Sequence, residues 1–171
     1  TDPSGSITSS VMNFTVKVAP EWSHEFQSDS LRVAISMDGE YIFIGAGEGN
    51  GNRTFNLFAK DNSTPLWTYT LPEGVSQGEV AISADGEYLV ACASYVEDGN
   101  AKGKIYLFTK DSSTPLWNYT TGSDVHSISI SADGEYIVAG SVSKKVYLFD
   151  KDSNTPLWSY SAGDNVYSVA I

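Results

Sequence analysis

The decapeptide KDSNTPLWSY (Lys151–Tyr160) is the third copy of a phrase that the chain uses twice before it. The earlier copies are KDNSTPLWTY (Lys60–Tyr69) and KDSSTPLWNY (Lys110–Tyr119). Both this phrase and a second one, DGEY, recur at intervals of about 40–50 residues, which is the period of propeller blades. The three copies of DGEY occupy residues 38–41, 85–88 and 133–136. The chain of 171 residues therefore predicts one structural unit that is repeated along its length.

Each unit contains four segments in which apolar and polar residues alternate, as they do in half-buried β-strands. The first strands are predicted at Arg32–Ser36, Glu79–Ser83 and Ser127–Ser131, and an Asp-Gly turn joins each to a second strand that begins at the tyrosine of DGEY. The third strands are FNLFAK, IYLFTK and VYLFDK, and the fourth are LWTY, LWNY and LWSY. Prolines 65, 115 and 156 are expected at strand starts, where a missing N–H costs little. Four antiparallel strands per repeat predict an all-β fold, a β-propeller, rather than the alternative of a flat sandwich.

Two sets of residues are predicted to join one blade to the next. The chain has one tryptophan per unit, which we expect to pack between blades: Trp22, Trp67, Trp117 and Trp158. Gly45, Cys92 and Gly140 are small residues at equivalent places in the second strands, where a neighbouring backbone is expected to come close. The variable lengths fall between the second and third strands, at residues 47–52, 96–103 and 143–145, and predict a variable rim.

The repeats divide the chain into blades. We predict a polar leader or linker at residues 1–12, a partial blade at 13–30, three complete blades at 31–75, 78–122 and 126–163, and the first strand of another blade at 166–171. Closed propellers usually have at least four blades. The chain is therefore expected to be part of a larger propeller, or to join other chains through its open ends as a shared propeller or a head-to-tail filament.

Two stretches carry a resemblance to known repeats. ISADGEYIVAGS (Ile130–Ser141) resembles the strand pair of a WD repeat, and YLFDKDSNTPLWSY (Tyr147–Tyr160) is similar to part of a quinoprotein-type (PQQ-like) repeat that ends in a Leu-Trp pair. The chain thus resembles the WD-like, quinoprotein-like propellers of prokaryotic, especially archaeal, surface proteins. The resemblance implies a propeller from about Ala19 to Ile171, and it says little of function because propellers host many activities.

The chain departs from these families at the residues that would carry a cofactor. The Trp-Asp dipeptide and the Gly-His pair of WD repeats are absent. Quinone-dependent relatives use vicinal cysteines and a calcium-binding acidic set, whereas this chain has only Cys92, which we expect to be a buried packing residue. No cofactor and no metal site is therefore expected.

Composition excludes some partners and favours one location. A formal net charge of -11 should repel nucleic acid and anionic membranes. No run approaches the roughly 20 apolar residues that span a bilayer, so no membrane insertion of this segment is expected. Four N-x-S/T sequons favour a secreted or cell-surface glycoprotein over a cytoplasmic one: Asn13, Asn52, Asn62 and Asn118.

The remaining candidate for a site is Asp124 with His126, just before a first strand, where propeller loops line the central funnel. Their counterparts in other units share no chemistry with them, so a solvated loop histidine is the plainer interpretation, and His24 is expected to decorate an edge. The sequence thus predicts a non-catalytic surface propeller that binds a protein partner or itself. The alternatives are a filament subunit and a fragment of a quinoprotein-like enzyme whose site lies in other blades.

Overall fold

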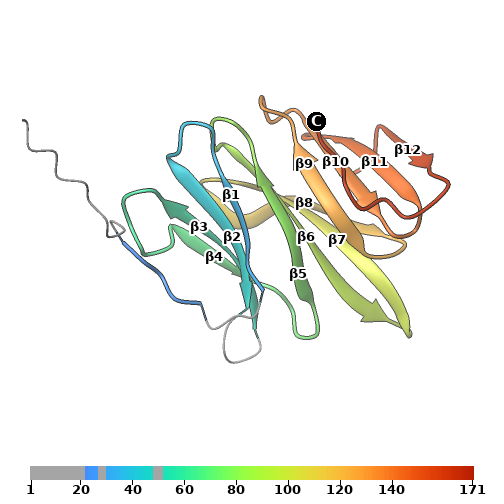
Figure 1. The fold of residues 1–171 in the computed structure, drawn as a ribbon, viewed down its shortest axis with the longest axis horizontal. Helices are drawn as coiled ribbons and strands as arrows, with labels where there is room; N and C mark the ends of the chain where they lie inside the picture. The colour runs from blue at the N-terminus through green and yellow to red at the C-terminus, as the bar shows by residue number, and fades with distance from the viewer. Residues whose placement is uncertain (1–21, 27–29, 48–51) are drawn as a thin grey trace, which may run out of the picture.

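The computed structural model describes residues 22–26, 30–47 and 52–171, which form three four-stranded antiparallel sheets side by side (Figure 1). The first blade contains β1 (Arg32–Ile35), β2 (Tyr41–Gly47), β3 (Arg53–Ala59) and β4 (Trp67–Thr70). The second contains β5 (Ser76–Ile82), β6 (Tyr88–Glu97), β7 (Asn100–Thr109) and β8 (Ser112–Thr121). The third contains β9 (Val125–Ile130), β10 (Tyr136–Ser141), β11 (Lys145–Asp150) and β12 (Trp158–Ser161). In every sheet the strands follow chain order, and the predicted fold class, an all-β propeller of blades, is confirmed.

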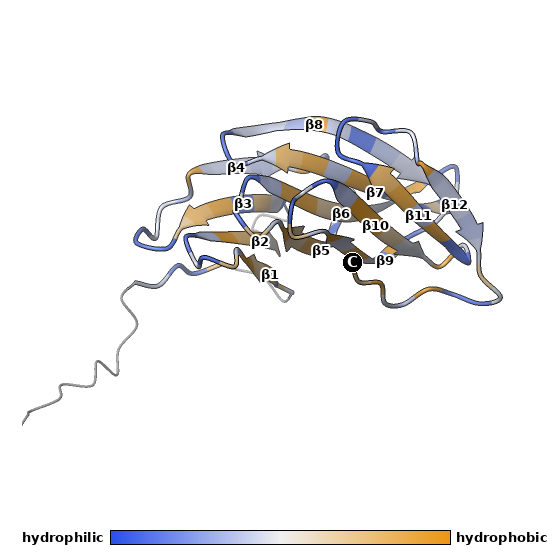
Figure 2. Ribbon diagram, turned by 90° about the horizontal axis from the view of Figure 1, so that it is seen from above, coloured by the Kyte–Doolittle hydropathy of each residue, from blue (hydrophilic) through white to orange (hydrophobic). Residues whose placement is uncertain are grey.

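The blades meet through their first strands. β1 lies against β5, and β5 lies against β9. Figure 2 shows these first strands along one edge of the molecule and the fourth strands β4, β8 and β12 along the opposite edge. The three sheets therefore fan out from a line of inner strands, as propeller blades do around an axis.

The core lies between the sheets rather than within one of them. Phe43, Phe55 and Leu57 of the first blade pack with Leu89 and Phe108 of the second, and all five are fully buried. A second cluster joins the second and third blades in the same way and includes Cys92, Leu107, Ile128, Ile137 and Phe149. Burying one such side chain contributes about 1.5–3 kcal/mol, so each blade depends on its neighbour for stability.

Each Asp-Gly turn is closed by a short hydrogen-bonded network. In the second blade the hydroxyl of Ser83 donates to the carboxylate of Asp85 over 2.6 Å. The backbone N–H of Tyr88 donates to the Ser83 oxygen, and that of Glu87 donates to the Asp85 carboxylate, each over 3.0 Å. The same bonds recur in the first and third blades, with the turn glycine always in the left-handed region. The turn therefore sets the register between the first two strands of every blade.

The second blade departs from the predicted strand boundaries. β6 and β7 have ten residues each and turn at Asp98 and Gly99, which both have positive φ, so this hairpin reaches beyond its counterparts. β8 also begins earlier than expected and includes Pro115, which corrects the prediction that this proline stands at a strand start. Pro115 is tolerated because β8 is an edge strand, where a missing N–H interrupts no ladder.

The segment after β12 forms no strand, although residues 166–171 are predicted to be the first strand of a further blade. It nevertheless lies along the third blade. The backbone N–H of Val166 donates to the carbonyl of Ser141, and that of Val169 donates to the hydroxyl of Ser127. The assignment of residues 166–171 to a further blade stays a prediction, as does the partial blade at 13–30, most of which lies outside the described residues.

Candidate functional site

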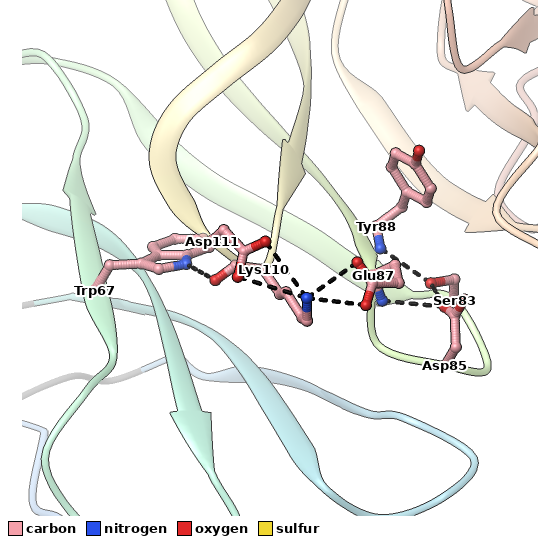
Figure 3. Close-up of polar contacts among 7 residues, drawn as sticks. All are labelled: Trp67, Ser83, Asp85, Glu87, Tyr88, Lys110 and Asp111. Atoms are coloured by element: carbon pink, nitrogen blue, oxygen red, sulfur yellow. Dashed lines mark hydrogen bonds and ion pairs between the residues drawn. The ribbon is translucent and has the colours of Figure 1, made fainter.

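The two repeated phrases of the sequence meet at the joint between neighbouring blades (Figure 3). Trp67 projects from β4, packs its ring 5.4 Å from that of Phe108 in the second blade, and donates its indole N–H to the carbonyl of Lys110 over 2.8 Å. Trp117 repeats the arrangement on the third blade, 5.5 Å from the ring of Phe149 and 2.7 Å from the carbonyl of Lys151. The repeated tryptophan thus combines apolar packing with a satisfied indole donor.

The DGEY phrase holds the acceptor of this joint in place. The backbone N–H of Lys110 donates to the carbonyl of Glu87, and the ammonium of Lys110 lies 2.9 Å from the Glu87 carboxylate (Figure 3). The hydrogen bond to Glu87, followed by one to Asp111, raises the pKa of Lys110. The ion pair is partly exposed and contributes little by itself. The backbone hydrogen bond between Lys110 and Glu87 fixes the peptide whose carbonyl receives the Trp67 indole.

A tyrosine makes a second contact between the same blades. The tyrosine that ends DGEY in one blade covers the turn glycine of the next: a Cβ on Gly86 would overlap the ring of Tyr41, and one on Gly134 would lie 2.6 Å from the ring of Tyr88. The small residues of the second strands also receive a neighbour, since a Cβ on Gly45 would lie 3.4 Å from Val80. The sequence could have indicated the tyrosine contact, because Gly and Tyr are repeated with equal regularity.

The outer two tryptophans differ from the inner two. Trp22 stacks 5.8 Å from Phe58 of the first blade and donates to the carbonyl of Lys60, so it makes a joint without belonging to a blade that the structure describes. Trp158 is 48 % exposed. His24, expected on an edge, joins the Trp22 contact: its ring lies 5.1 Å from Phe58, and its Nδ1 lies 2.8 Å from the carbonyl oxygen of Ser63, to which it donates.

The predicted funnel residues lie near one another in the structure. Asp124 and His126 border a hollow of about 260 Å³ near the inner strands, together with Arg32 and Glu79, which form an ion pair of 2.6 Å. His126 belongs to β9 rather than to a preceding loop, and its exposed ring packs edge-on against Tyr167 at 5.6 Å. Within the described part of the chain no hydrogen bond joins Asp124 to His126, so the hollow presents mixed charges without a positioned acid–base pair.

The long hairpin of the second blade forms the most distinctive surface. A hollow of about 360 Å³ lies between this hairpin and the connection from β4 to β5. The residues around it are apolar, aromatic and charged: Pro72, Glu73, Val75, Tyr95, Glu97, Lys104 and Tyr106. The ammonium of Lys104 lies 5.5 Å from the centre of the Tyr106 ring. Burial raises the pKa of the Tyr106 phenol, which stays neutral as a packing surface.

The glycosylation candidates that the structure describes are all on the surface. Asn52, Asn62 and Asn118 are exposed, whereas Asn13 lies outside the described residues. Asn118 stands in the middle of β8, the outermost strand of its blade, and Thr120 of its sequon is also exposed. Thr54 of the Asn52 sequon is buried. Thr64 of the Asn62 sequon is exposed as well, so Asn62 and Asn118 are the two sites whose asparagine and threonine are both accessible.

Cysteine chemistry, metal binding and membrane-spanning helices were assessed in the residues that the structure describes. Cys92 is fully buried, and burial raises the pKa of its thiol to about 12, so it cannot act as a thiolate nucleophile near neutral pH. Across residues 22–26, 30–47 and 52–171, no group of three or more His, Cys, Asp or Glu side chains is placed to hold a metal ion. The same ranges contain no helix long and apolar enough to cross a bilayer.

Comparison with known families supports the interpretation as a repeat propeller. Residues 113–150 match the model of the WD domain, G-beta repeat. The matched stretch starts in β8, includes Trp117 and runs through β11, so it spans the joint between the second and third blades. The match covers less than half of the chain, which is therefore similar to a WD repeat over these residues. No curated protein matches the chain.

Proposed function

We propose that the chain is a non-catalytic propeller module that binds a protein partner through its rim, chiefly through the β6–β7 hairpin. The observation that carries this proposal is that the repeated residues and the residues of the hairpin lie in different parts of the structure. The repeated residues meet at the joints between blades, whereas the extended part of the hairpin, Tyr95–Lys102, has no counterpart in the third blade, where the pairing of β10 with β11 ends at Ser141 and Lys145. Residues that the scaffold does not require, and that one blade alone carries, are the ones available for recognition.

The surface of the hairpin is suited to a protein. Val96 is 71 % exposed near its tip, and the half-buried Tyr95 offers aromatic area beside the charges of Glu73, Glu97 and Lys104. Aromatic residues with a polar rim are typical of interfaces. The WD repeat match supports the same conclusion, because such propellers usually mediate protein–protein interactions and are generally non-catalytic scaffolds.

The location of this module is proposed to be extracellular or on the cell surface, with N-glycans on its outer strands. Support comes from the exposed sequon asparagines, above all Asn62 and Asn118, and from the resemblance to PQQ-like repeats of archaeal surface proteins, which the Leu-Trp pairs carry. When the wild type is expressed through a secretory pathway, its intact mass should exceed the mass of the bare polypeptide by the mass of its glycans. The variant Asn118→Gln, expressed in the same way, should lack the mass of one glycan. Equal intact masses would count against this location.

The binding proposal is tested with three baits in the extract of the source cells: the wild type, Tyr95→Ala/Val96→Asp, and the control variant Leu116→Asp, which places the same charge at an exposed apolar residue of the outer strand β8. A partner of the rim should bind the wild type and Leu116→Asp, and should lose at least about tenfold in affinity for the hairpin variant when it is purified and titrated. If every protein retained by the wild type binds the hairpin variant equally well, the hairpin is not the interface and the proposal fails.

A further inference from the structure

The outer faces of the first and third blades carry complementary halves of the contact that joins blades inside the molecule. At the two inner boundaries a tyrosine covers a turn glycine, Tyr41 on Gly86 and Tyr88 on Gly134. The third tyrosine, Tyr136, is 41 % exposed, and the remaining turn glycine, Gly39, has no atom of the described residues within 4 Å of the place where a Cβ would stand. The third blade thus presents an exposed tyrosine, Tyr136, and the first blade presents an uncovered turn glycine, Gly39.

The tryptophan contact shows the same complementarity. Trp158 pairs with Leu148 in register, as Trp67 pairs with Leu57 and Trp117 with Leu107. Its strand therefore has the conformation of the inner joints but lacks their partner. Tyr160, two residues further on, is 66 % exposed, whereas its counterparts in the first and second blades are half-buried.

The matching acceptor stands at the opposite end of the same chain. Phe58 and the carbonyl of Lys60 in the first blade are equivalent to Phe108 and Lys110, which receive Trp67. Their ability to receive an indole is shown by Trp22, which stacks on Phe58 and donates to Lys60.

The first strands of the blades show the same complementarity between the two outer faces. Val80 and Ile128, on the first strands of the second and third blades, are 8 % and 7 % exposed because each packs on the preceding blade. The equivalent Val33 on β1 is 61 % exposed. The surface that it would cover on the third blade of the other copy is at Gly140 on β10, the counterpart of Gly45 that receives Val80.

We propose that two copies of this chain close into a six-bladed ring, in which the third blade of each copy docks on the first blade of the other. Trp158 then enters the joint at Phe58 and Lys60 of the second copy, and Tyr136 covers its Gly39. A two-fold symmetric dimer satisfies both open ends at once, and six blades lie within the usual range of propellers. This inference rests on the proposed function only in taking the chain as a propeller module, since it uses none of the hairpin residues.

Two segments of the chain occupy these contacts in the single copy and would have to leave them. Trp22 holds the acceptor at Phe58. Val166 and Val169 lie on Gly140, since a Cβ there would come within 2.6 Å and 3.1 Å of their side chains. Both segments occupy the places where residues of a neighbouring blade pack at the inner joints, so dimer formation replaces contacts within one copy by similar contacts between copies. Removing a competing segment should therefore strengthen the dimer.

The test is sedimentation of the 171-residue chain over a range of concentrations, with folding of every variant checked by circular dichroism. The wild type should approach twice its mass of 18.4 kDa and stop there. Added salt should favour this dimer, because it screens the repulsion between two copies of net charge -11. A mass that stays at one chain overturns the proposal, and so does a mass that grows without limit, because the ring would not close.

Variants of the two outer tryptophans give effects of opposite sign. Trp158→Ala should raise the dimer dissociation constant by roughly tenfold or more, as the loss of an interface anchor does. Trp22→Ala should lower it, because it frees the acceptor. Val33→Asp places a charge in the interface and should also weaken the dimer, whereas Val96→Asp, at a residue that is also exposed but lies on the hairpin, should leave it unchanged. A dimer whose dissociation constant is unchanged by Trp158→Ala and Val33→Asp uses another surface and refutes the proposal. Binding of a partner to the hairpin is measured in a separate experiment, so its result does not depend on the dimer.

Discussion

Truncation of Trp117 measures how much one joint stabilises the molecule. An indole side chain can bury about 150–250 Å². Trp117 is mostly buried, so Trp117→Ala should return about 100–150 Å² of apolar surface to water, which amounts to about 3 kcal/mol at about 25 cal/mol per Å². The hydrogen bond from its indole to the carbonyl of Lys151 adds about 1 kcal/mol. The free energy of unfolding should therefore fall by about 3–4 kcal/mol, and Trp117→Phe, which keeps a ring but no donor, should lose about 1–2 kcal/mol.

The matched control is Trp158→Ala, which changes the same residue in the same local sequence. Half of the Trp158 side chain is already in water, and its indole donates no hydrogen bond to the residues that the structure describes, so its loss should cost only about 1–2 kcal/mol. Urea unfolding followed by circular dichroism, at a concentration low enough to keep the chain monomeric, compares the three variants with the wild type. Equal losses for Trp117→Ala and Trp158→Ala would mean that contact with the next blade contributes nothing, and would refute the reasoning.

Three further variants or conditions test the other contacts. Gly86→Ala should destabilise the protein by at least about 1 kcal/mol more than Gly39→Ala. Both substitutions replace a glycine of positive φ, but among the described residues only Gly86 lies under a tyrosine ring, that of Tyr41. Equal losses of unfolding free energy in urea would contradict that contact. The hydrogen bond from the turn serine lowers the pKa of Asp85 below 3.8, so its stabilisation is present at neutral pH and is lost as the pH falls below that value. The stability difference between the wild type and Asp85→Ala should therefore shrink from pH 7 toward pH 2, and a constant difference would show that the aspartate charge is irrelevant. Cys92 should react with iodoacetamide only on unfolding, and rapid modification of the native protein at pH 8 would show that its burial is wrong.

Local repetition made most of the fold predictable. The second strands begin at Tyr41, Tyr88 and Tyr136 as expected, because the Asp-Gly turn fixes the residue at which the chain reverses. β5 begins three residues before its predicted start at Glu79, because an irregularity in its pairing between Gln77 and Val80 interrupts the alternation on which the prediction relied.

The candidate surface was harder to predict, for a related physical reason. The hollow beside the hairpin brings Glu73, before β5, next to Tyr95 and Lys104, on β6 and β7. Lys104 corresponds to Lys145 of the third blade, but Glu73 and Tyr95 correspond to no repeated residue, so no repeat marks the surface that the three form together. Trp158 has the same local sequence as Trp67 and Trp117, so the sequence alone does not distinguish its 48 % exposure from their burial, which depends on contact with the next blade.

Exchange of the four indole protons, followed by nuclear magnetic resonance, tests the joints most directly. With each signal assigned by single Trp→Phe substitutions, dilute native protein should show slow exchange for the Nε1–H groups of Trp67 and Trp117, which donate to a carbonyl of the next blade, and fast exchange for Trp158. Similar rates for these three protons would contradict the central claim that one repeated tryptophan locks each blade to the one that follows it.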